Sequence, residues 1–220
     1  LLVRKEKGMT VEQTVLNKLH YYFENKYDKY IGNRIIIVQG DLTADGFGLQ
    51  QDKLFEIGNS VSTIINSAAK VSHDGNYFEF YNTNVKSVDK IISFAKTFKC
   101  KIYHISTLSI SGNAFFEQYY LEQKFKENKT FAENNLYIGQ ELQNVYIKTK
   151  FEAEKRIFDA ILDGVDSYIL RMGNLMPRIS DGKFQDNYNE NAYMNRLKAL
   201  IKIGSIPDTL LNGYLEFSPI

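Results

Sequence analysis

Residues 34–42 read Arg-Ile-Ile-Ile-Val-Gln-Gly-Asp-Leu. The run from Ile35 to Val38 is β-branched, too short for a helix and apolar on both faces, which is typical of a strand buried in a parallel sheet. Comparable runs occur at 1–3, 61–66, 101–105 and 166–170, and stretches with helical spacing occur at 10–23, 49–57, 77–98, 146–162 and 191–203. This alternation predicts an α/β fold built on a Rossmann-like, doubly wound parallel sheet.

Composition restricts the classes of partner. The chain has 220 residues, with 27 basic and 26 acidic side chains, so a net charge of +1 gives no reason to expect nucleic acid or an anionic membrane as a partner. Cys100 is the single cysteine, and the three histidines are scattered in the sequence, so we expect neither a disulfide nor a metal site. No apolar run approaches the roughly 20 residues that span a bilayer, and no signal peptide pattern opens the chain. The cytoplasm is therefore the expected compartment.

Domain boundaries are not signalled, because the chain has three prolines, no internal repeat and no low-complexity tract. We predict a single domain over residues 1–220. Residues 112–140 are rich in Glu, Lys, Asn and aromatic residues without a clear period, and we interpret them as an insertion or lid. Residues 176–220 are interpreted as the start of a substrate-binding part.

Ligands of open parallel sheets bind at the carboxyl ends of the strands, so the residues that follow each strand are the candidates. Arg4 and Lys5 supply positive charge where an NAD-selective protein usually places an acid, which favours the 2′-phosphate of NADPH. Asp41, followed by Leu42, could accept a hydrogen bond from the adenine amino group. A solvated basic loop and a helix-capping aspartate are the structural alternatives.

Two further strand ends carry small residues. Ser67, Ala68 and Ala69 would let the backbone approach a flat cofactor, although the same residues would suit tight packing of a strand on a helix. Gly173 and Asn174 directly follow the strand at 166–170. Together with the preceding positions, they outline a cofactor site along one edge of the sheet.

Tyr146 and Lys150 stand four residues apart at the start of an amphipathic helix, which stacks them on one face. A phenol has an ordinary pKa of roughly 10, and we expect the neighbouring ammonium to lower it. Thr107 follows a strand and could face this helix across a cleft. A hydroxyl, a phenol and an ammonium that converge could polarise a carbonyl and deliver a proton to its oxygen. Tyr-x-x-x-Lys also occurs by chance, and a threonine at a strand end is often structural.

The chain resembles the extended short-chain dehydrogenase/reductases and, more narrowly, the thioester reductase domains of nonribosomal peptide synthetases and carboxylic acid reductases. The resemblance spans nearly the whole chain and rests on Leu2-Val3-Arg4, Gly40-Asp41-Leu42, Asn66 to Val71, Asn84-Val85, Ile105-Ser106-Thr107, Tyr146 to Glu154, Leu170 to Asn174 and Asp181 to Gln185. It implies that Thr107, Tyr146 and Lys150 are catalytic and that Arg4 contacts the 2′-phosphate of NADPH. It also implies that Lys150 binds the nicotinamide ribose.

The implied reaction is reductive release of an acyl or peptidyl thioester, carried on the phosphopantetheine arm of a carrier protein, to an aldehyde or further to an alcohol. The chain departs from this family in one respect, because no Gly-x-x-Gly-x-x-Gly loop occurs to hold the pyrophosphate. The strand that carries this loop would sit between the strands at 1–3 and 61–66, and we expect a fold that is incomplete at both ends. A nucleotide-sugar epimerase or dehydratase, and a non-catalytic incomplete reductase module, are the alternatives.

Overall fold

The computed structural model describes residues 1–72, 75–112, 131–206 and 217–219. In the first half of the chain the elements are β1 (Leu2–Val3), α1 (Val11–Phe23), η1 (Asp28–Tyr30), β2 (Val38–Gln39), η2 (Asp45–Gly48), α2 (Gln51–Ser60), β3 (Thr63–Asn66), α3 (Tyr77–Tyr81), η3 (Asn82–Lys86), α4 (Ser87–Phe98), β4 (Lys101–Thr107) and η4 (Leu108–Ser111). The second half contains α6 (Val145–Leu162), β5 (Ser167–Met172), β6 (Asn174–Met176), η5 (Tyr188–Glu190), α7 (Ala192–Ile203) and β7 (Phe217–Pro219).

All strand pairs in the described residues are parallel, as the sequence predicts. The hydrogen-bonded orders are β1–β2, β3–β4–β5 and β6–β7. The central strand β4 pairs Asn66 of β3 with His104 and pairs Met172 of β5 with Thr107. Because the strands are parallel, the segments that follow Asn66, Thr107 and Met172 lie along one edge of the three-stranded sheet.

The described strands do not form one continuous sheet. Neither β1 nor β3 is hydrogen-bonded to the other, so the β1–β2 pair is separate from the β3–β4–β5 sheet. The interruption lies between the strands at 1–3 and 61–66, where the sequence leads us to expect a further strand. In this arrangement β3 is an edge strand, and Ile65 is 70% exposed.

The strand predicted over residues 34–38 is wrong in extent, because only Val38 and Gln39 pair with β1. Ile35 forms an isolated bridge with Ile31 instead, and Ile36 is 50% exposed rather than buried. A β-branched run becomes a buried strand only where neighbouring strands flank it, and β1 offers two residues for pairing.

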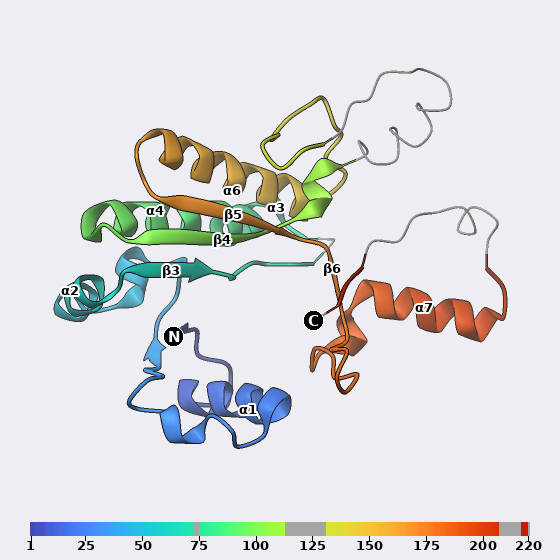
Figure 1. Cartoon of the computed structure of the whole chain (residues 1–220), viewed down its shortest axis with the longest axis horizontal. Helices are drawn as coiled ribbons and strands as arrows, with labels where there is room; N and C mark the ends of the chain where they lie inside the picture. The colour runs from blue at the N-terminus through green and yellow to red at the C-terminus, as the bar shows by residue number, and fades with distance from the viewer. Residues whose placement is uncertain (73–74, 113–130, 207–216, 220) are drawn as a thin grey trace.

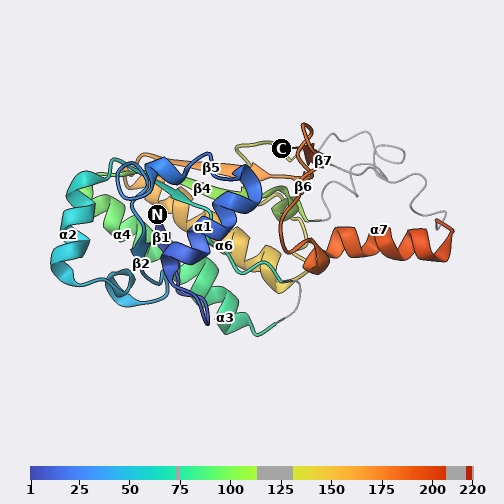
Figure 2. The same cartoon turned by 90° about the horizontal axis from the view of Figure 1, so that it is seen from below.

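Helices α4 and α6 pack on the three-stranded sheet, α1 lies with β1 and β2 beyond the strand β3, and α7 extends away (Figures 1 and 2). The core lies where α4 and α6 pack on β4, and its members include Val88, Ile91, Ala95, Ile102, Ala153 and Ile157. The opposite face remains more open, since Tyr168 and Leu170 of β5 are 45% and 42% exposed.

Capping residues and glycine mark several helix ends. Thr10 caps α1 in a reciprocal capping box with Gln13. Asn191 caps α7, and Gly164, with a φ of +86°, follows the end of α6. The helix predicted over 77–98 is continuous, but it contains a π-helical turn at η3. Within the described residues, no helix combines the length and the apolar character needed to cross a membrane.

The predicted insertion at 112–140 falls largely on residues 113–130, which lie outside the described residues. Its two ends meet, because the backbone of Gly112 packs against the carbonyl group of Glu141 so closely that a side chain at position 112 would clash. Gln140 closes the junction by donating to the carbonyl oxygen atoms of Ile110, at 3.0 Å, and Leu136, at 2.9 Å. Residues 207–216 and 220 of the predicted substrate-binding part also lie outside the described residues.

Candidate active site

The predicted hydroxyl pair meets at the end of β4. Asn144 caps α6 by accepting a hydrogen bond from the backbone N–H of Ile147 at 2.9 Å, so Tyr146 stands in the first turn of that helix. Thr107 ends β4, and its Oγ1 accepts from the N–H of Ser109 at 3.2 Å. The Thr107 hydroxyl lies close enough to the Tyr146 phenol to act on the pKa of that phenol, so the end of the strand meets the start of the helix. The structure therefore brings together two of the three predicted catalytic groups.

Lys150 lies one turn further along α6 and is 2% exposed. Its Nζ donates to the carbonyl oxygen of Ile105 at 2.7 Å and lies 3.3 Å from Nε2 of His104. Burial lowers the pKa of Lys150 to about 8, while the carboxylate of Glu154 acts in the opposite direction. The Lys150 side chain is thus directed at β4.

Burial raises the pKa of Tyr146, and the neighbouring Thr107 side chain opposes this shift. The sequence leads us to expect that Lys150 lowers the Tyr146 pKa, and this expectation does not hold in the arrangement observed. The reason is geometric, because the Nζ of Lys150 bonds to the backbone of β4 and the desolvation of the phenol dominates.

Asn84 supports this corner of the site. Its Nδ2 donates to Thr149 Oγ1 on α6 at 3.0 Å, and its amide bonds to both the N–H and the carbonyl oxygen of Lys70, at 2.7 and 3.1 Å. Asn84 was not among the predicted site residues. It occupies a position between Phe80 and Val88 on the apolar stripe of its helix, so a polar residue on a buried face was the available signal.

The segments after β3 and β5 flank Thr107. Ser67 and Ala68 are exposed and Ala69 is half-buried, so this loop offers backbone and small side chains to a ligand. Gly173 and Asn174 follow Met172, the register partner of Thr107, and Asn174 begins β6. Sheet register therefore places these predicted cofactor positions at the same edge as Thr107.

The remaining predicted cofactor residues form a second group at the ends of β1 and β2. Arg4 is exposed, and its charge contributes to lowering the pKa of Asp41. The larger cause is Thr43, whose N–H and Oγ1 both donate to Asp41 Oδ1 at 2.7 Å. Asp41 thus shapes its own loop rather than capping α2, and Leu42 packs against the core.

A buried ion pair joins three segments beside the site. Arg171 of β5 donates to Glu154 of α6, with Nη2 at 2.8 Å from Oε2, and Glu154 is fully buried. The guanidinium also donates to the carbonyl oxygen of Asn135 at 2.7 Å and to that of Glu133 at 3.2 Å. The strand, the helix and the segment that leads into the helix are held by one side chain.

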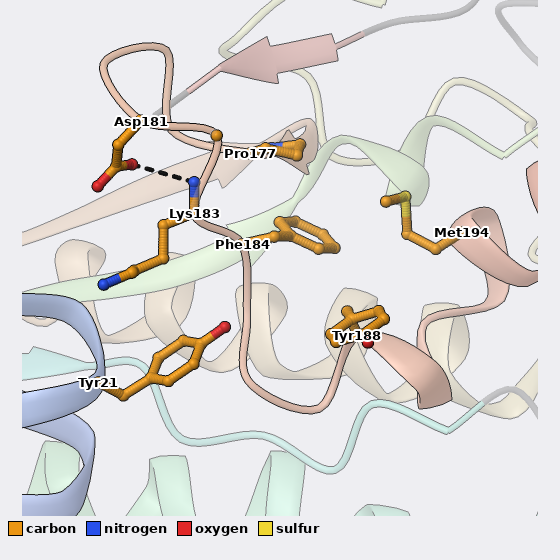
Figure 3. Close-up of a pocket in the computed structure, with 8 residues that line it drawn as sticks. Tyr21, Pro177, Asp181, Lys183, Phe184, Tyr188 and Met194 are labelled. Carbon is orange, nitrogen blue, oxygen red and sulfur yellow. Dashed lines mark hydrogen bonds between the residues drawn. The ribbon is translucent and has the colours of Figure 1, made fainter.

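A pocket of about 410 Å³ opens between α1 and the segment after β6. Figure 3 shows Phe184, Tyr188 and Met194 around it, with Tyr21 reaching in from α1. The carboxylate of Asp181 already has partners in the protein, because it accepts hydrogen bonds from Arg178 and from the N–H of Lys183. The lining is therefore mainly apolar and aromatic.

The parallel sheet, the helices that cover it and the hydroxyl, phenol and amine at the end of β4 define a Rossmann-like fold of the extended short-chain dehydrogenase/reductase class, which uses a nicotinamide cofactor. The sequence profile of the NAD-binding family described as Male sterility protein matches residues 1–220. The chain belongs to this family.

Among curated proteins, the chain is 28% identical over 192 residues to the large subunit of L-2-aminoadipate reductase from Candida glabrata, covering 86% of this chain and 14% of that protein. It is 32% identical over 181 residues to probable polyketide synthase 38 from Dictyostelium discoideum, covering 80% of this chain and 5% of that protein. The chain therefore spans a small part of these relatives.

Among solved structures, the thiolation-reductase di-domain of an archaeal nonribosomal peptide synthetase is 32% identical, with a TM-score of 0.83 over 99% of this chain and 56% of that one. The terminal reductase domain of the myxalamid pathway has a TM-score of 0.77 at 20% identity, covering 99% of this chain and 51% of that one, and it supports the fold alone.

Proposed function

We propose that this chain reduces a carrier-bound acyl or peptidyl thioester with NADPH and releases an aldehyde, with the alcohol as the alternative end product. The observation that carries the proposal is that the side chains of Thr107 and Tyr146 lie next to each other at the carboxyl end of β4, with Lys150 one turn away. The similarity to an archaeal thiolation-reductase di-domain supports a thioester on a carrier protein as the substrate.

The strand-end residues fit the nicotinamide half of the cofactor, because Ser67 and Ala68 leave exposed backbone beside Thr107. Lys150 would bind the ribose after its Nζ leaves the carbonyl oxygen of Ile105, and Gly173 and Asn174 would border the ring. For the adenosine half, Arg4 would pair with the 2′-phosphate, with Asp41 and Leu42 alongside. A glycine-rich pyrophosphate loop does not occur in these 220 residues.

The proposed reaction divides the work between cofactor and protein. NADPH, when bound, supplies the hydride that reduces the thioester carbonyl carbon. Thr107 holds the carbonyl oxygen by donating its hydroxyl hydrogen, and Tyr146 transfers its phenolic proton to that oxygen as negative charge develops there. The resulting hemithioacetal loses the thiol of the phosphopantetheine arm, which leaves the aldehyde. The aromatic pocket at Phe184 and Tyr188 would suit an apolar acyl group.

Tyr146→Phe tests the catalytic assignment. We expect kcat to fall by roughly a hundredfold or more, because the proton donor is removed, whereas the Kd for NADPH should stay within about twofold. NADPH oxidation with an acyl-phosphopantetheine thioester and trapping of the aldehyde measure the rate, and calorimetry measures binding. Tyr103→Phe, which alters a tyrosine stacked on Tyr168, is the matched control.

Three outcomes would contradict the proposal. Full activity in Tyr146→Phe would remove Tyr146 from the mechanism. Turnover of sugar nucleotides without thioester turnover would favour an epimerase or dehydratase. A cooperative melt without any NADPH binding would favour a non-catalytic module.

Arg4→Ala tests the choice of NADPH over NADH. Loss of a charge-assisted contact with the 2′-phosphate should raise KM for NADPH by roughly 10- to 100-fold and leave KM for NADH nearly unchanged. Steady-state kinetics with both cofactors provide the measurement, and Lys7→Ala, another exposed cation in the same loop, is the control. An equal change in KM for NADPH and for NADH would show that Arg4 does not contact the 2′-phosphate.

A further inference from the structure

His104 is buried beside Lys150, and the proposed reaction gives it no role. It is 1% exposed and lies on the face of β4 that packs against α6. Burial, together with the charge of Lys150, lowers the pKa of His104 to about 3, so the imidazole is neutral at physiological pH. A neutral imidazole has one nitrogen that donates and one that accepts.

The partners of His104 assign its tautomer. Asn66 Oδ1 accepts from the N–H of Ala68 at 3.3 Å, which leaves Asn66 Nδ2 facing His104 Nδ1 at 3.1 Å. An amide nitrogen only donates, so Nδ1 must accept and the ring hydrogen must be on Nε2. The Nε2–H then faces Lys150 Nζ at 3.3 Å.

This tautomer distinguishes between the two charge states of Lys150. A neutral amine has a lone pair that can accept from Nε2–H while its own N–H donates to the Ile105 carbonyl oxygen at 2.7 Å. An ammonium has three donors and no acceptor, so it would face another donor. A hydrogen bond to the neutral form of a group disfavours its charged form.

We propose that Asn66 and His104 form a buried hydrogen-bond relay that positions Lys150 and favours its neutral amine. Besides His104, the ionisable group that acts on Lys150 is Glu154 on α6, whose charge opposes the loss of the Lys150 proton, and Glu154 is itself paired with Arg171 of β5. His104 acts through Lys150 and is therefore a positioning residue. Protonation of Lys150 requires the ring hydrogen to move to Nδ1 and the Asn66 amide to turn, which breaks the bond from Ala68.

Nuclear magnetic resonance of the full chain tests the tautomer directly. With ¹⁵N-labelled histidine, we expect the His104 signal, assigned with His104→Gln, to show a neutral ring from pH 5 upwards, with its hydrogen on Nε2 at pH 9.5, where Lys150 is largely deprotonated. An Nδ1–H tautomer in the wild-type protein at pH 9.5, or protonation of the ring near the ordinary histidine pKa of about 6.5, would overturn the proposal. This measurement needs neither cofactor nor substrate, so it can fail or succeed independently of the proposed function.

The effect on Lys150 is tested with two variants of Asn66. Asn66→Leu is close in size and releases the tautomer, whereas Asn66→Asp forces a hydrogen onto Nδ1. In both we expect Lys150, followed through its ¹³Cε shift, to bind protons at least tenfold more tightly than in the wild type. Ser167→Ala, on the neighbouring strand β5, is the control and should leave this titration unchanged.

An unchanged Lys150 titration in a folded Asn66 variant would overturn the proposal. If neither variant folds, the tautomer of His104 in the wild-type protein still tests the proposal. This last test depends on the proposed function. If the protein carries out the proposed reduction, the pH above which its rate falls should be higher in Asn66→Leu than in the wild type.

Discussion

At the scale of single residues, Lys150 makes stability depend on pH. Its pKa is about 8 in the folded protein, against 10.5 ordinarily. Between these values the unfolded chain binds more protons than the folded protein, so the free energy of unfolding should rise as pH increases through this window. Relative to Lys150→Met, we expect the wild type to gain about 1 to 2 kcal/mol between pH 8 and 9.5, measured by urea denaturation. Lys148→Met, which changes an exposed lysine of the same helix, should follow the wild type. Identical pH dependence in wild type and Lys150→Met would refute this prediction.

At the scale of elements, Arg171 joins β5, α6 and the segment at 132–135 through one guanidinium, which is 9% exposed as a side chain. Arg171→Met should cost about 3 to 5 kcal/mol of unfolding free energy, because it leaves the Glu154 carboxylate buried without a partner. Adding Glu154→Leu should restore much of that loss, since two apolar side chains then replace two charges. Denaturant titration of the single and double variants measures both effects. Lys53→Met breaks an exposed pair with Glu56 and should change stability by less than about 1 kcal/mol. A double variant no more stable than Arg171→Met would argue against an ionic role.

At the scale of the whole molecule, the break between β1 and β3 leaves β3 paired on one side among the described residues, whereas β4 is paired on both sides. Alternate backbone N–H groups of an edge strand point away from its neighbour. In hydrogen-exchange measurements we therefore expect β4 to be protected along its length, while alternate amides of Thr63–Asn66 exchange at least tenfold faster. Uniform protection of β3 would mean that another segment covers its free edge.

The sequence by itself determined what depends on local spacing. The four-residue interval between Tyr146 and Lys150, the helical spacing over 10–23 and the alternating apolar runs predicted α6, α1 and the parallel strands, because helix and strand periods are properties of the chain. The start of α6 and the strand end at Thr107 were also predictable in this way.

Only the tertiary structure decided which side chains meet across elements. Lys150 contacts His104, which is 46 residues away in sequence, and Asn84 contacts Thr149, which is 65 residues away. The pKa of Tyr146 was predicted in the wrong direction for the same reason, since desolvation and the aim of the Lys150 amine depend on packing. The extent of β2 depended on how many residues of β1 were available to pair with it. Spacing along the chain thus fixes the elements and their faces, whereas burial and partner choice arise when those faces pack together.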